Sequence, residues 1–573
     1  MAVTHTEDRA GVLDGGARSS HDAPADTKDA SGRVDLEEKR DLDISLEHRE
    51  YILQRHGTLE LSPFPSASAA DPLNWPSWKK HMNLSLVAFH ALITTFIASG
   101  VIPAYQAFAE MFHVSLQEAS YYTSVQILFL GVSPLFWKPI SNRFGRRPVW
   151  LISTFCAAIC NIGCAESKSY GSMMACRVLV AIFISPPIGI GSAVVTEMFF
   201  QHERGQKMGL WTLLVTLGPP TGPFIMGFVT YHVGWKWVYW IFAITNAVQF
   251  FGYLFFGPET RYVRENAPGV STFKAEYLQF RRIDPTPLSL ADFYQPLLFA
   301  RYSDVLIPTI SYAVVFAFAC VLGTVEIPQL FEEKFEFNPQ QIGLQFLGII
   351  IGTVLGEQFG GPFSDFWMNR RTKQLRGQRP HPEYRLWSSY LGFICVIVGM
   401  VVFCVQIDRA VPMHWDVTPL VGIGIAAFGN QVTTTVLITY AIDCHPQHSA
   451  SVGVFITLIR QIWGFIGPFW FPDMFTSLGL RGSAGLIAGL VAVVSVLPIM
   501  LLQWKGARVL IECDPSVKAI ILKYDEERHD YIVEDLDDDR HLVIKESQLQ
   551  NLKARLGREL DEKVMQPEES ESE

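Results

Sequence analysis

Charged residues are scarce through most of this 573-residue sequence. Asp, Glu, Lys and Arg make up 18% of it and hydrophobic residues 49%, which is too apolar for an ordinary soluble surface. A large share of the charges lies in residues 1–80 and 505–573, whereas the stretch from Asn83 to Pro103 contains none. This distribution excludes a series of ordinary soluble domains.

Signatures of catalysis are also missing. No Gly-rich phosphate-binding loop precedes a Lys-Ser or Lys-Thr pair, which argues against an ATP-driven pump. The loops hold no convincing nucleophile and base, so we predict that the chain is not an enzyme and has no cofactor. The nine cysteines lack metal-ligand spacing. We therefore predict no metal site and interpret them as apolar packing groups.

Uncharged apolar runs, in contrast, recur between residues 82 and 504. They reach the length of about 20 residues that a membrane-spanning helix needs. They are too long for barrel strands, and unpaired backbone groups are costly in hydrocarbon. The sequence predicts an all-α polytopic membrane protein rather than buried helices of a large soluble protein. Twelve transmembrane helices are expected, over residues 83–103, 118–140, 149–165, 174–199, 208–231, 237–257, 303–325, 341–363, 387–406, 417–441, 451–472 and 484–504.

Loop charge predicts the orientation of these helices. If the amino terminus is cytosolic, the loops on that side carry most of the Lys and Arg residues, and the opposite loops carry few. This positive-inside bias predicts that both termini are cytosolic, and we expect the plasma membrane. No cleavable signal peptide is visible. The net charge of −10 comes largely from the tails, so no direct nucleic-acid contact is predicted.

The two groups of six helices echo each other. Pro139-Ile-Ser-Asn-Arg-Phe-Gly-Arg-Arg147 follows the second predicted span, and Pro362-Phe-Ser-Asp-Phe-Trp-Met-Asn-Arg-Arg371 follows the eighth. The fifth and eleventh spans each carry Gly-Pro-Phe, beginning at Gly222 and Gly467. Glu197 and Asp443 end the fourth and tenth spans. Three matches in the same order indicate a tandem repeat of the kind found in secondary transporters.

These features resemble the major facilitator superfamily over about residues 80–504. The loop after the second span is similar to the family motif Gly-x-x-x-Asp-Arg-x-Gly-Arg-Arg, with Lys138 in place of the first Gly and Asn142 in place of Asp. The resemblance implies a latch for the outward-facing state; the alternative is that the arginines only set topology. The latch candidates are Asn142, Arg143, Gly145, Arg146, Arg147, Glu197, Arg204, Asp365, Arg370, Arg371 and Asp443.

Asn142 keeps a hydrogen-bond acceptor but loses the ion pair of a carboxylate. A weaker latch is therefore expected, with Arg143 still reaching Glu197.

The fifth predicted span contains Gly218-Pro-Pro-Thr-Gly222-Pro223-Phe-Ile-Met-Gly227. It resembles the antiporter motif of exporters in this family. Gly lets helices approach closely and Pro loosens backbone hydrogen bonding, so the stretch is expected to form a pliable seam; simple helix packing is the alternative. Together with Asp71-Pro-Leu-Asn-Trp75 and Gly356-Glu-Gln-Phe-Gly-Gly-Pro-Phe-Ser-Asp365, it is similar to the fungal drug:proton antiporter group.

Few ionisable residues lie inside the predicted spans, and these are the candidates for proton coupling. We hypothesise that Glu357 and Arg460 form a buried pair, either for coupling or as a permanent structural salt bridge. Arg177 stands where the family has an arginine in its fourth span, although an interfacial arginine is an alternative. His90 titrates near neutral pH, although packing is the alternative role.

A substrate site is expected between the two halves near the midplane. The cavity candidates are Gln126, Tyr312, Phe316, Asn430 and Gln431.

The composition changes to soluble and acidic after Trp504. Residues 508–513, 531–536 and 541–544 read as strands, and Asp514-Pro515 opens a helix through about Lys523. Ser547 precedes a final predicted helix with an apolar stripe formed by Leu549, Leu552, Leu556 and Leu560.

This segment, residues 505–566, closely resembles the smallest subunit of the transcription and repair factor TFIIH. The resemblance implies pairing with a TFIIH core subunit, with roles in nucleotide excision repair and transcription initiation. A genuine fusion and a reading of two adjacent genes as one both remain open. In the second case the segment is a separate nuclear product.

The predicted organisation is a disordered cytosolic tail, a six-helix half, a cytosolic loop, a second six-helix half, a small α/β domain and a disordered acidic tail. Their boundaries are 1–75, 76–258, 259–300, 301–504, 505–566 and 567–573.

The leading prediction is a secondary transporter that exports a small organic molecule, either a drug or a metabolite, in exchange for protons. A nutrient importer or a membrane sensor of the same fold is the alternative. The expected partners are the lipid bilayer, the substrate and protons.

Overall fold

The computed structural model describes residues 46–59, 61, 63–262, 277, 282–374, 382–445, 448–506, 508–512, 515–528, 532–535, 541–545, 552 and 556. The chain divides into two compact units, Met1–Leu61 and Ser62–Glu573. Helix α2 (Leu46–His56) is the described element of the first unit.

The prediction of disorder through residue 75 is wrong for two segments. One is α2, and the other is the buried 3-10 turn η1 (Pro72–Asn74) in the second unit. The Asp71 carboxylate accepts a hydrogen bond from the backbone N–H of Leu73 at 3.0 Å and thereby caps this turn.

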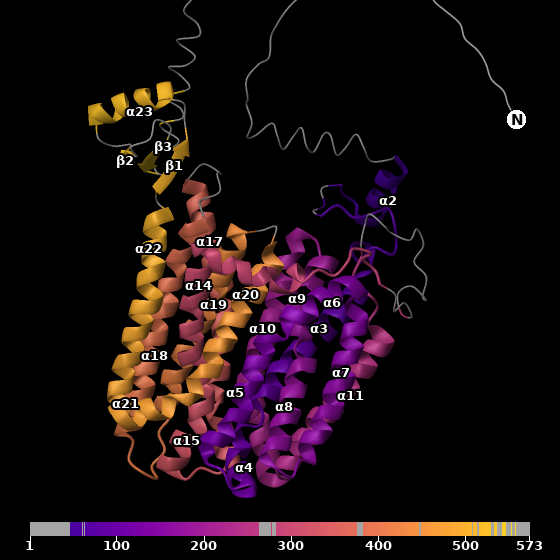
Figure 1. Cartoon of the computed structure of the whole chain (residues 1–573), viewed down its shortest axis with the longest axis vertical. Coiled ribbons are helices and arrows are strands. Elements are labelled where there is room, and N and C mark those ends of the chain that lie inside the picture. The colour runs from indigo at the N-terminus through magenta and orange to yellow at the C-terminus, as the bar shows by residue number, and fades with distance from the viewer. Residues whose placement is uncertain are drawn as a thin grey trace, which may run out of the picture. The chain divides into compact units, whose positions relative to one another are not determined.

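The second unit is nearly all helical (Figure 1). Within the described residues, eleven helical segments are long and apolar enough to cross a membrane. They are Ser77–Phe112, Arg146–Ala165, Tyr170–Met198, Gln206–His232, Trp235–Phe256, Ser303–Phe335, Pro339–Gln374, Pro382–Arg409, Thr418–Cys444, Ser449–Phe469 and Phe471–Trp504.

The predicted span 118–140 is not among the eleven because it is interrupted. It consists of α5 (Leu116–Val132) and α6 (Pro134–Phe144), which meet at Ser133. The break coincides with Pro134, whose ring is compatible with the start of a helix but not with its interior. Neither α5, with 17 residues, nor α6, with 11, reaches the length of a span by itself.

Most helices in the first half are separated by short turns. The elements are α3 (Ser77–Ser99), η2 (Ile102–Ala104), α4 (Tyr105–Phe112), α5, α6, α7 (Arg146–Ala165), α8 (Tyr170–Ile184), α9 (Pro186–Met198), α10 (Gln201–His232) and α11 (Trp235–Phe256).

Two short elements, α13 (Ala291–Tyr294) and η4 (Gln295–Arg301), lead into the second half. That half contains α14 (Ser303–Phe316), the π-helix η5 (Ala317–Leu322), α15 (Gly323–Phe335), α16 (Pro339–Gln345), α17 (Leu347–Gln374), η6 (Pro382–Ser388), α18 (Ser389–Arg409), α19 (Thr418–Cys444), α20 (Ser449–Ile466), η8 (Gly467–Phe469), α21 (Phe471–Leu490), η9 (Val491–Val496) and α22 (Leu497–Gly506).

The internal repeat is visible in two matching turns. Helix α4 ends at left-handed His113 (φ 55°), and α15 ends at left-handed Glu336 (φ 53°). Two residues later, Ser115 and Asn338 each form a capping box with the helix that follows. In each box the side chain accepts a hydrogen bond from a backbone N–H and the third helical residue bonds back. The two halves thus use the same local geometry with different residues.

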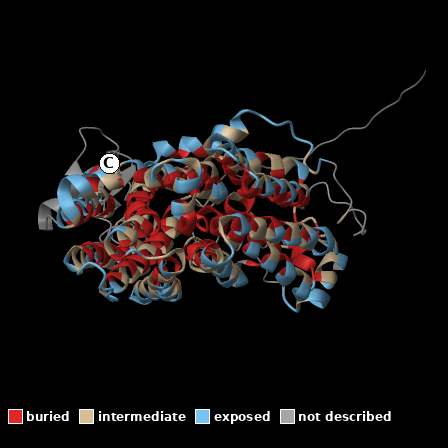
Figure 2. Ribbon diagram, turned by 90° about the horizontal axis from the view of Figure 1, so that it is seen from below, coloured by how far each residue is buried: buried red, intermediate tan, exposed pale blue. Residues whose placement is uncertain are grey.

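Burial follows the helix contacts. In Figure 2 the buried residues gather where helices face one another and the exposed residues line the outward faces. Many of those outward residues are large and apolar, for example Phe155, Phe255 and Ile394, which are 52%, 64% and 59% exposed. An apolar outer surface on such helices matches a lipid environment.

The halves meet along two pairs of contacts. Helix α10 of the first half packs on α16 and α17, and α20 of the second half packs on α5 and α9. The residues at these contacts therefore feel any relative movement of the halves.

The carboxyl-terminal segment contains a three-stranded antiparallel sheet. Its strands are β1 (Arg508–Glu512), β2 (Ile532–Asp535) and β3 (His541–Lys545), in the order β1-β3-β2, and α23 (Pro515–Arg528) follows β1. Arg508 pairs with Lys545 and Ile532 with Ile544. Of the predicted final helix, Leu552 and Leu556 are described and are helical. Asp514, Ser547, Leu549, Leu560 and the tail 567–573 lie outside the described residues.

Candidate functional site

The chain turns sharply between α6 and α7 at Gly145, where φ is +98°. A Cβ atom here would lie 2.8 Å from Cδ of Glu259, so both conformation and space require glycine. The turn makes Arg146 the first residue of α7. We refer to this end of the helices as the motif end.

Arg146 joins three elements at the motif end. Its Nη2 donates to Oε1 of Glu197, at the end of α9, at 2.8 Å, and its Nη1 donates to Oγ of Ser141 in α6 at 2.5 Å. The arginine is 3% exposed. Arg261 lies 3.7 Å from the same Glu197 oxygen. A buried, hydrogen-bonded ion pair of this kind fixes the relative position of the helices that carry it.

Arg143 does not reach Glu197, contrary to the prediction. Its two Nη atoms instead pair with Asp284 at 2.5 Å and Asp292 at 3.1 Å. Arg143 lies in the last turn of α6, before the Gly145 turn, whereas Arg146 lies after it. The turn therefore directs the two arginines to different partners. Within the described residues, the Asn142 side chain makes no hydrogen bond.

Two further predicted arginines bind helix ends. Arg147 donates to the carbonyl oxygens of Tyr253, Leu254 and Gly257 at the end of α11. Arg204 donates to the carbonyl oxygens of Thr196 and Phe199 at 3.3 Å. Cations at helix carboxyl termini offset the unpaired carbonyls there.

Glu259 was not predicted, yet it lies at the centre of this cluster. Its Oε1 accepts from the backbone N–H groups of Arg146 and Arg261 at 2.8 Å, and its Oε2 accepts from that of Arg147 at 3.0 Å. Burial raises the pKa of Glu259, and these three hydrogen bonds act in the opposite direction. The sequence signal that could have identified Glu259 is its position directly after an apolar run, in Gly-Pro-Glu-Thr-Arg261.

The second half forms a similar cluster with an arginine from elsewhere in the sequence. Arg385 donates to Oγ of Ser364 at 2.9 Å and pairs with Asp365 at 3.3 Å and Asp443 at 3.4 Å. Ser364 and Asp443 are the repeat equivalents of Ser141 and Glu197.

Arg370 and Arg371, the sequence equivalents of Arg146 and Arg147, lie outside this cluster. Helix α17 continues through them to Gln374 because no glycine turn interrupts it. Arg370 is exposed, and the Arg371 guanidinium lies over the Tyr384 ring at 5.4 Å.

One contact at the motif end crosses between the halves. Nζ of Lys138 in α6 donates to Oγ of Ser451 in the first turn of α20 at 2.7 Å. Lys138 is one of the two departures from the family motif. A hydroxyl contact therefore connects the halves at this point.

The glycines of the fifth-span motif face two different neighbours. A Cβ atom at Gly218 would lie 2.7 Å from the carbonyl oxygen of Leu92, and one at Gly222 would lie 2.7 Å from that of Phe96. Both neighbours belong to α3, beside α10 in the first half. Pro223 lies within α10, and its carbonyl oxygen would be 2.8 Å from a Cβ atom at Gly343 in α16.

Gly227 connects the halves by a backbone contact. A Cβ atom there would lie 2.6 Å from the carbonyl oxygen of Pro339 and 3.1 Å from Cα of Gly343. We call the Gly227–Gly343 contact the glycine seam.

The predicted pair of Glu357 and Arg460 does not form. Glu357 in α17 accepts a hydrogen bond from Nε2 of Gln431 in α19. Arg460 in α20 donates to the hydroxyl of Tyr312 in α14 at 2.7 Å, and its guanidinium lies 4.7 Å from the centre of the Phe316 ring. Glu357 and Arg460 thus each bind a neutral side chain instead of one another.

Arg177 and His90 lie inside the first half. Arg177 is fully buried and donates to the carbonyl oxygens of Ile97 and Ala98 at 3.1 Å. His90 Nδ1 lies 3.2 Å from the hydroxyl of Tyr253, and the imidazole packs edge-on against Trp150. The carbonyl partners of Arg177 belong to α3, and the aromatic neighbours of His90 belong to α7 and α11.

The cavity candidates fall into two groups. Tyr312 and Phe316 contact Arg460, and Gln431 contacts Glu357. Gln126 is fully buried, and neither of its amide atoms has a hydrogen-bond partner among the described residues. The same is true of Oδ1 of Asn430.

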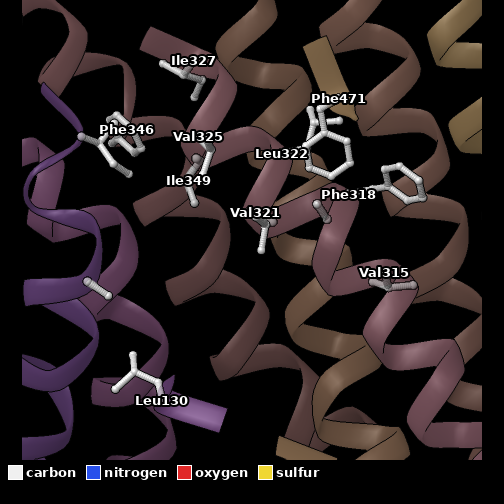
Figure 3. Close-up of a cluster of buried hydrophobic side chains, with 14 of the residues drawn as sticks. Leu130, Val315, Phe318, Val321, Leu322, Val325, Ile327, Phe346, Ile349 and Phe471 are labelled. Carbon is white, nitrogen blue, oxygen red and sulfur yellow. The ribbon is translucent and has the colours of Figure 1, made fainter. Parts of the chain in front are cut away.

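Glu326 is a second acidic residue that was not predicted. It lies in α15, is 1% exposed, and its Oε1 has no hydrogen-bond partner in the described part of the chain. Its sequence neighbours Val325 and Ile327 belong to the apolar cluster drawn in Figure 3, which also contains Phe346 and Ile349. The sequence signal that could have identified Glu326 is that it is one acidic residue in the apolar run Gly323-Thr-Val-Glu-Ile327.

The family model described as Major Facilitator Superfamily matches residues 85–468, which is more than half of the chain. The chain belongs to the major facilitator superfamily. It is an integral, multi-pass membrane transporter, and it has relatives that are described as efflux pumps.

Several curated fungal proteins are similar over most of their length. The chain is 29% identical over 444 residues to "MFS transporter cpaT" of Aspergillus oryzae, which covers 75% of this chain and 87% of that protein. It is 25% identical over 449 residues to "Efflux pump radE" of Floropilus chiversii, covering 76% and 82%. For "Efflux pump FUBT" of Fusarium oxysporum it is 26% identical over 453 residues, covering 78% and 75%.

Solved structures share the fold. The human organic anion transporter MFSD10 (TETRAN) matches with a TM-score of 0.53 and 16% identity, covering 75% of this chain and all of that chain. The peptide transporter POT in complex with sulfate matches with a TM-score of 0.55 and 12% identity, covering 74% and 94%.

The carboxyl-terminal segment has its own match. The family model described as Transcription factor TFIIH complex subunit Tfb5 matches residues 504–568. This finding supports the TFIIH-like character that was predicted for residues 505–566.

We expect the Asp284→Ala variant to be less stable at neutral pH, by about 1 kcal/mol because the site is partly exposed to solvent. Hydrogen bonds from Thr286, together with Arg143, lower the pKa of Asp284 to about 2. The stabilisation is therefore complete above the unfolded pKa, about 3.9, and is lost as the pH falls through about 2. The measurement is the unfolding temperature in detergent of the wild type and the variant, with the exposed Glu203→Ala as the control. The difference between wild type and Asp284→Ala should shrink below about pH 4. A difference that is independent of pH would contradict the assignment.

We expect Gly227→Ala to destabilise the chain by about 1–3 kcal/mol, because the added methyl group overlaps the backbone of α16. Gly209→Ala is the matched control, since Gly209 is on the same helix and a Cβ atom there meets nothing within 4 Å. The apparent unfolding temperature of the two variants provides the comparison. Equal stability would argue against the glycine seam.

Proposed function

We propose that this transporter exports a small organic molecule in exchange for protons. The observation that carries the proposal is Glu326, a buried carboxyl group without a cationic partner among the described residues. An ionised carboxylate in that position is costly, so the group holds a proton in this conformation. The efflux pumps among the relatives and the glycine motif of α10 support the outward direction.

The proposed topology has twelve spans, with α5 and α6 acting together as the second span. An even number leaves both termini on the same side, and the loop arginines favour the cytosol. The motif end then faces the cytosol. We propose the plasma membrane as the location.

The motif-end clusters act as latches in this proposal. Arg146 holds α6, α7 and α9 together, and Arg385 holds the equivalent region of the second half. The Lys138–Ser451 hydrogen bond is the connection that breaks when the motif end opens. A single hydroxyl bond costs less to break than a buried ion pair, so this latch is weak.

Two carboxyl groups are candidates for the proton carrier. Glu357 is partly buried and has an amide partner, Gln431, whereas one Glu326 oxygen has no partner. The elements that pack on α15 bring few titratable groups. Element η5 contributes Cys320, α16 contributes none, and Tyr105 of α4 directly follows η2. Glu326 is therefore the primary carrier. It takes up its proton from water at the end opposite the motif end and releases it toward the cytosol at the motif end.

We expect Glu326→Gln to abolish uphill transport, because a permanently neutral amide cannot carry a proton. Proteoliposomes with an imposed pH gradient would measure accumulation of rhodamine 6G and naphthalene-1-sulfonate, with an expected loss of at least tenfold. Exposed Glu333→Gln on the same helix is the control. If transport by the Glu326→Gln variant depends on the pH gradient as in the wild type, Glu326 is not the carrier. If only Glu357→Gln loses this dependence, Glu357 is the carrier instead.

A nutrient importer or sensor of the same fold is the alternative. Reversing the imposed pH gradient in the same vesicles separates the two directions, since an exporter moves substrate against the proton flow. An importer would accumulate substrate together with protons.

We also propose that the carboxyl-terminal segment binds a TFIIH core subunit. Strands β1 and β2 form the edges of the described sheet, and an edge strand offers unpaired backbone groups to a partner strand. The segment then has a binding function independent of transport, in a fusion protein or as a separate nuclear product.

We expect the detergent-solubilised full chain to retain a TFIIH core subunit, and a chain truncated after Trp504 to lose it. Co-purification from cells that express the core subunit measures this. An antibody against residues 505–566 should detect one band near 64.4 kDa if the fusion is genuine. A separate small product would instead identify two genes, and no retention by the full chain would refute the binding role.

A further inference from the structure

Arg460 is a cation inside the membrane-spanning region, and the described residues supply no anion to pair with it. It lies near the middle of α20. No carboxylate of the described residues forms an ion pair with it. Its Nη1 donates to the Tyr312 hydroxyl, and its Nε has no hydrogen-bond partner among those residues.

The aromatic neighbours of Arg460 stabilise its charge only in part. The guanidinium lies 5.6 Å from the centre of the Tyr312 ring and 4.7 Å from that of the Phe316 ring. Such contacts stabilise a cation only weakly compared with the cost of an unpaired charge in a medium of low polarity. Arginine has a planar fork of donors, and most of them remain available for a bidentate anion.

This group lies where the two halves meet. At Gly464, one turn from Arg460 on α20, a Cβ atom would lie 3.2 Å from both Phe316 and Ile127. Ile127 belongs to α5 of the first half. The contact between α5 and α20 therefore lies beside an aromatic neighbour of Arg460.

We propose that Arg460, Tyr312 and Phe316 form a binding site for an organic anion with an aromatic ring. The guanidinium pairs with the anionic group, and the two aromatic side chains contact the ring. The proposal rests on the proposed export function and specifies its substrate class.

Binding to the purified full chain tests this site without any proton gradient. The probes are naphthalene-1-sulfonate and the neutral naphthalene-1-sulfonamide, which share a ring system and differ in charge. Isothermal titration in detergent should give at least tenfold tighter binding of the sulfonate to the wild-type chain. Equal affinities in the wild type would overturn the proposal without any variant.

Variants then assign the preference to Arg460. Arg460→Gln should weaken sulfonate binding at least tenfold and change sulfonamide binding less than twofold, while Arg460→Lys should retain part of the preference. The control is Arg409→Gln at the exposed end of α18. An unchanged preference in Arg460→Gln, or an equal loss for both probes, would reject the site.

The two proposals fail separately. If the sulfonate preference depends on Arg460 but no transport follows the pH gradient, the anion site stands and proton-driven export fails. If transport follows the pH gradient but no sulfonate preference is found, export stands and the substrate class is wrong.

Discussion

Hydrocarbon offers no hydrogen bonds, so each polar group inside the helices must find its partner within the chain. Most do. Buried Ser and Thr hydroxyls bond to carbonyl oxygens, commonly one turn back in the same helix, as Thr94 does to His90 and Thr154 to Trp150. Arg177 uses two carbonyl oxygens of α3. Glu326, Arg460 and Gln126 are among the described side chains that keep polar atoms without a hydrogen-bond partner, and such exceptions are candidates for function.

The repeat conserves geometry better than it conserves residue positions. His113 and Glu336 both adopt the left-handed conformation and precede capping boxes, although the sequences around them differ. At the motif end, one glycine decides the outcome. Gly145 ends α6 and brings Arg146 to Glu197, whereas α17 has no such turn and the equivalent role passes to Arg385, beyond the end of that helix.

Hydropathy was sufficient to predict a membrane protein in two similar halves, because the length of an apolar helix is a strong constraint. It did not predict the break at Ser133 between α5 and α6, which leaves eleven continuous candidate spans. Charge in a linear sequence identified Arg146 and Glu197 but not their pairing, and it suggested a Glu357–Arg460 pair that does not form. Side-chain partners depend on helix rotation, which apolar runs in a lipid environment do not encode. Glu259 and Glu326 were missed although an acidic residue beside or within an apolar run marked each of them. Arg385 was missed because its partners lie far from it in the sequence.

The glycine seam also restricts the kind of movement that the halves can make. Gly227 and Gly343 touch backbone to backbone, and their nearest neighbours along either helix carry side chains. Sliding one helix along the other would drive those side chains into the opposing main chain, whereas tilting about the contact keeps the two small residues together. The geometry of this one contact therefore favours tilting of the two helices over translation of one along the other.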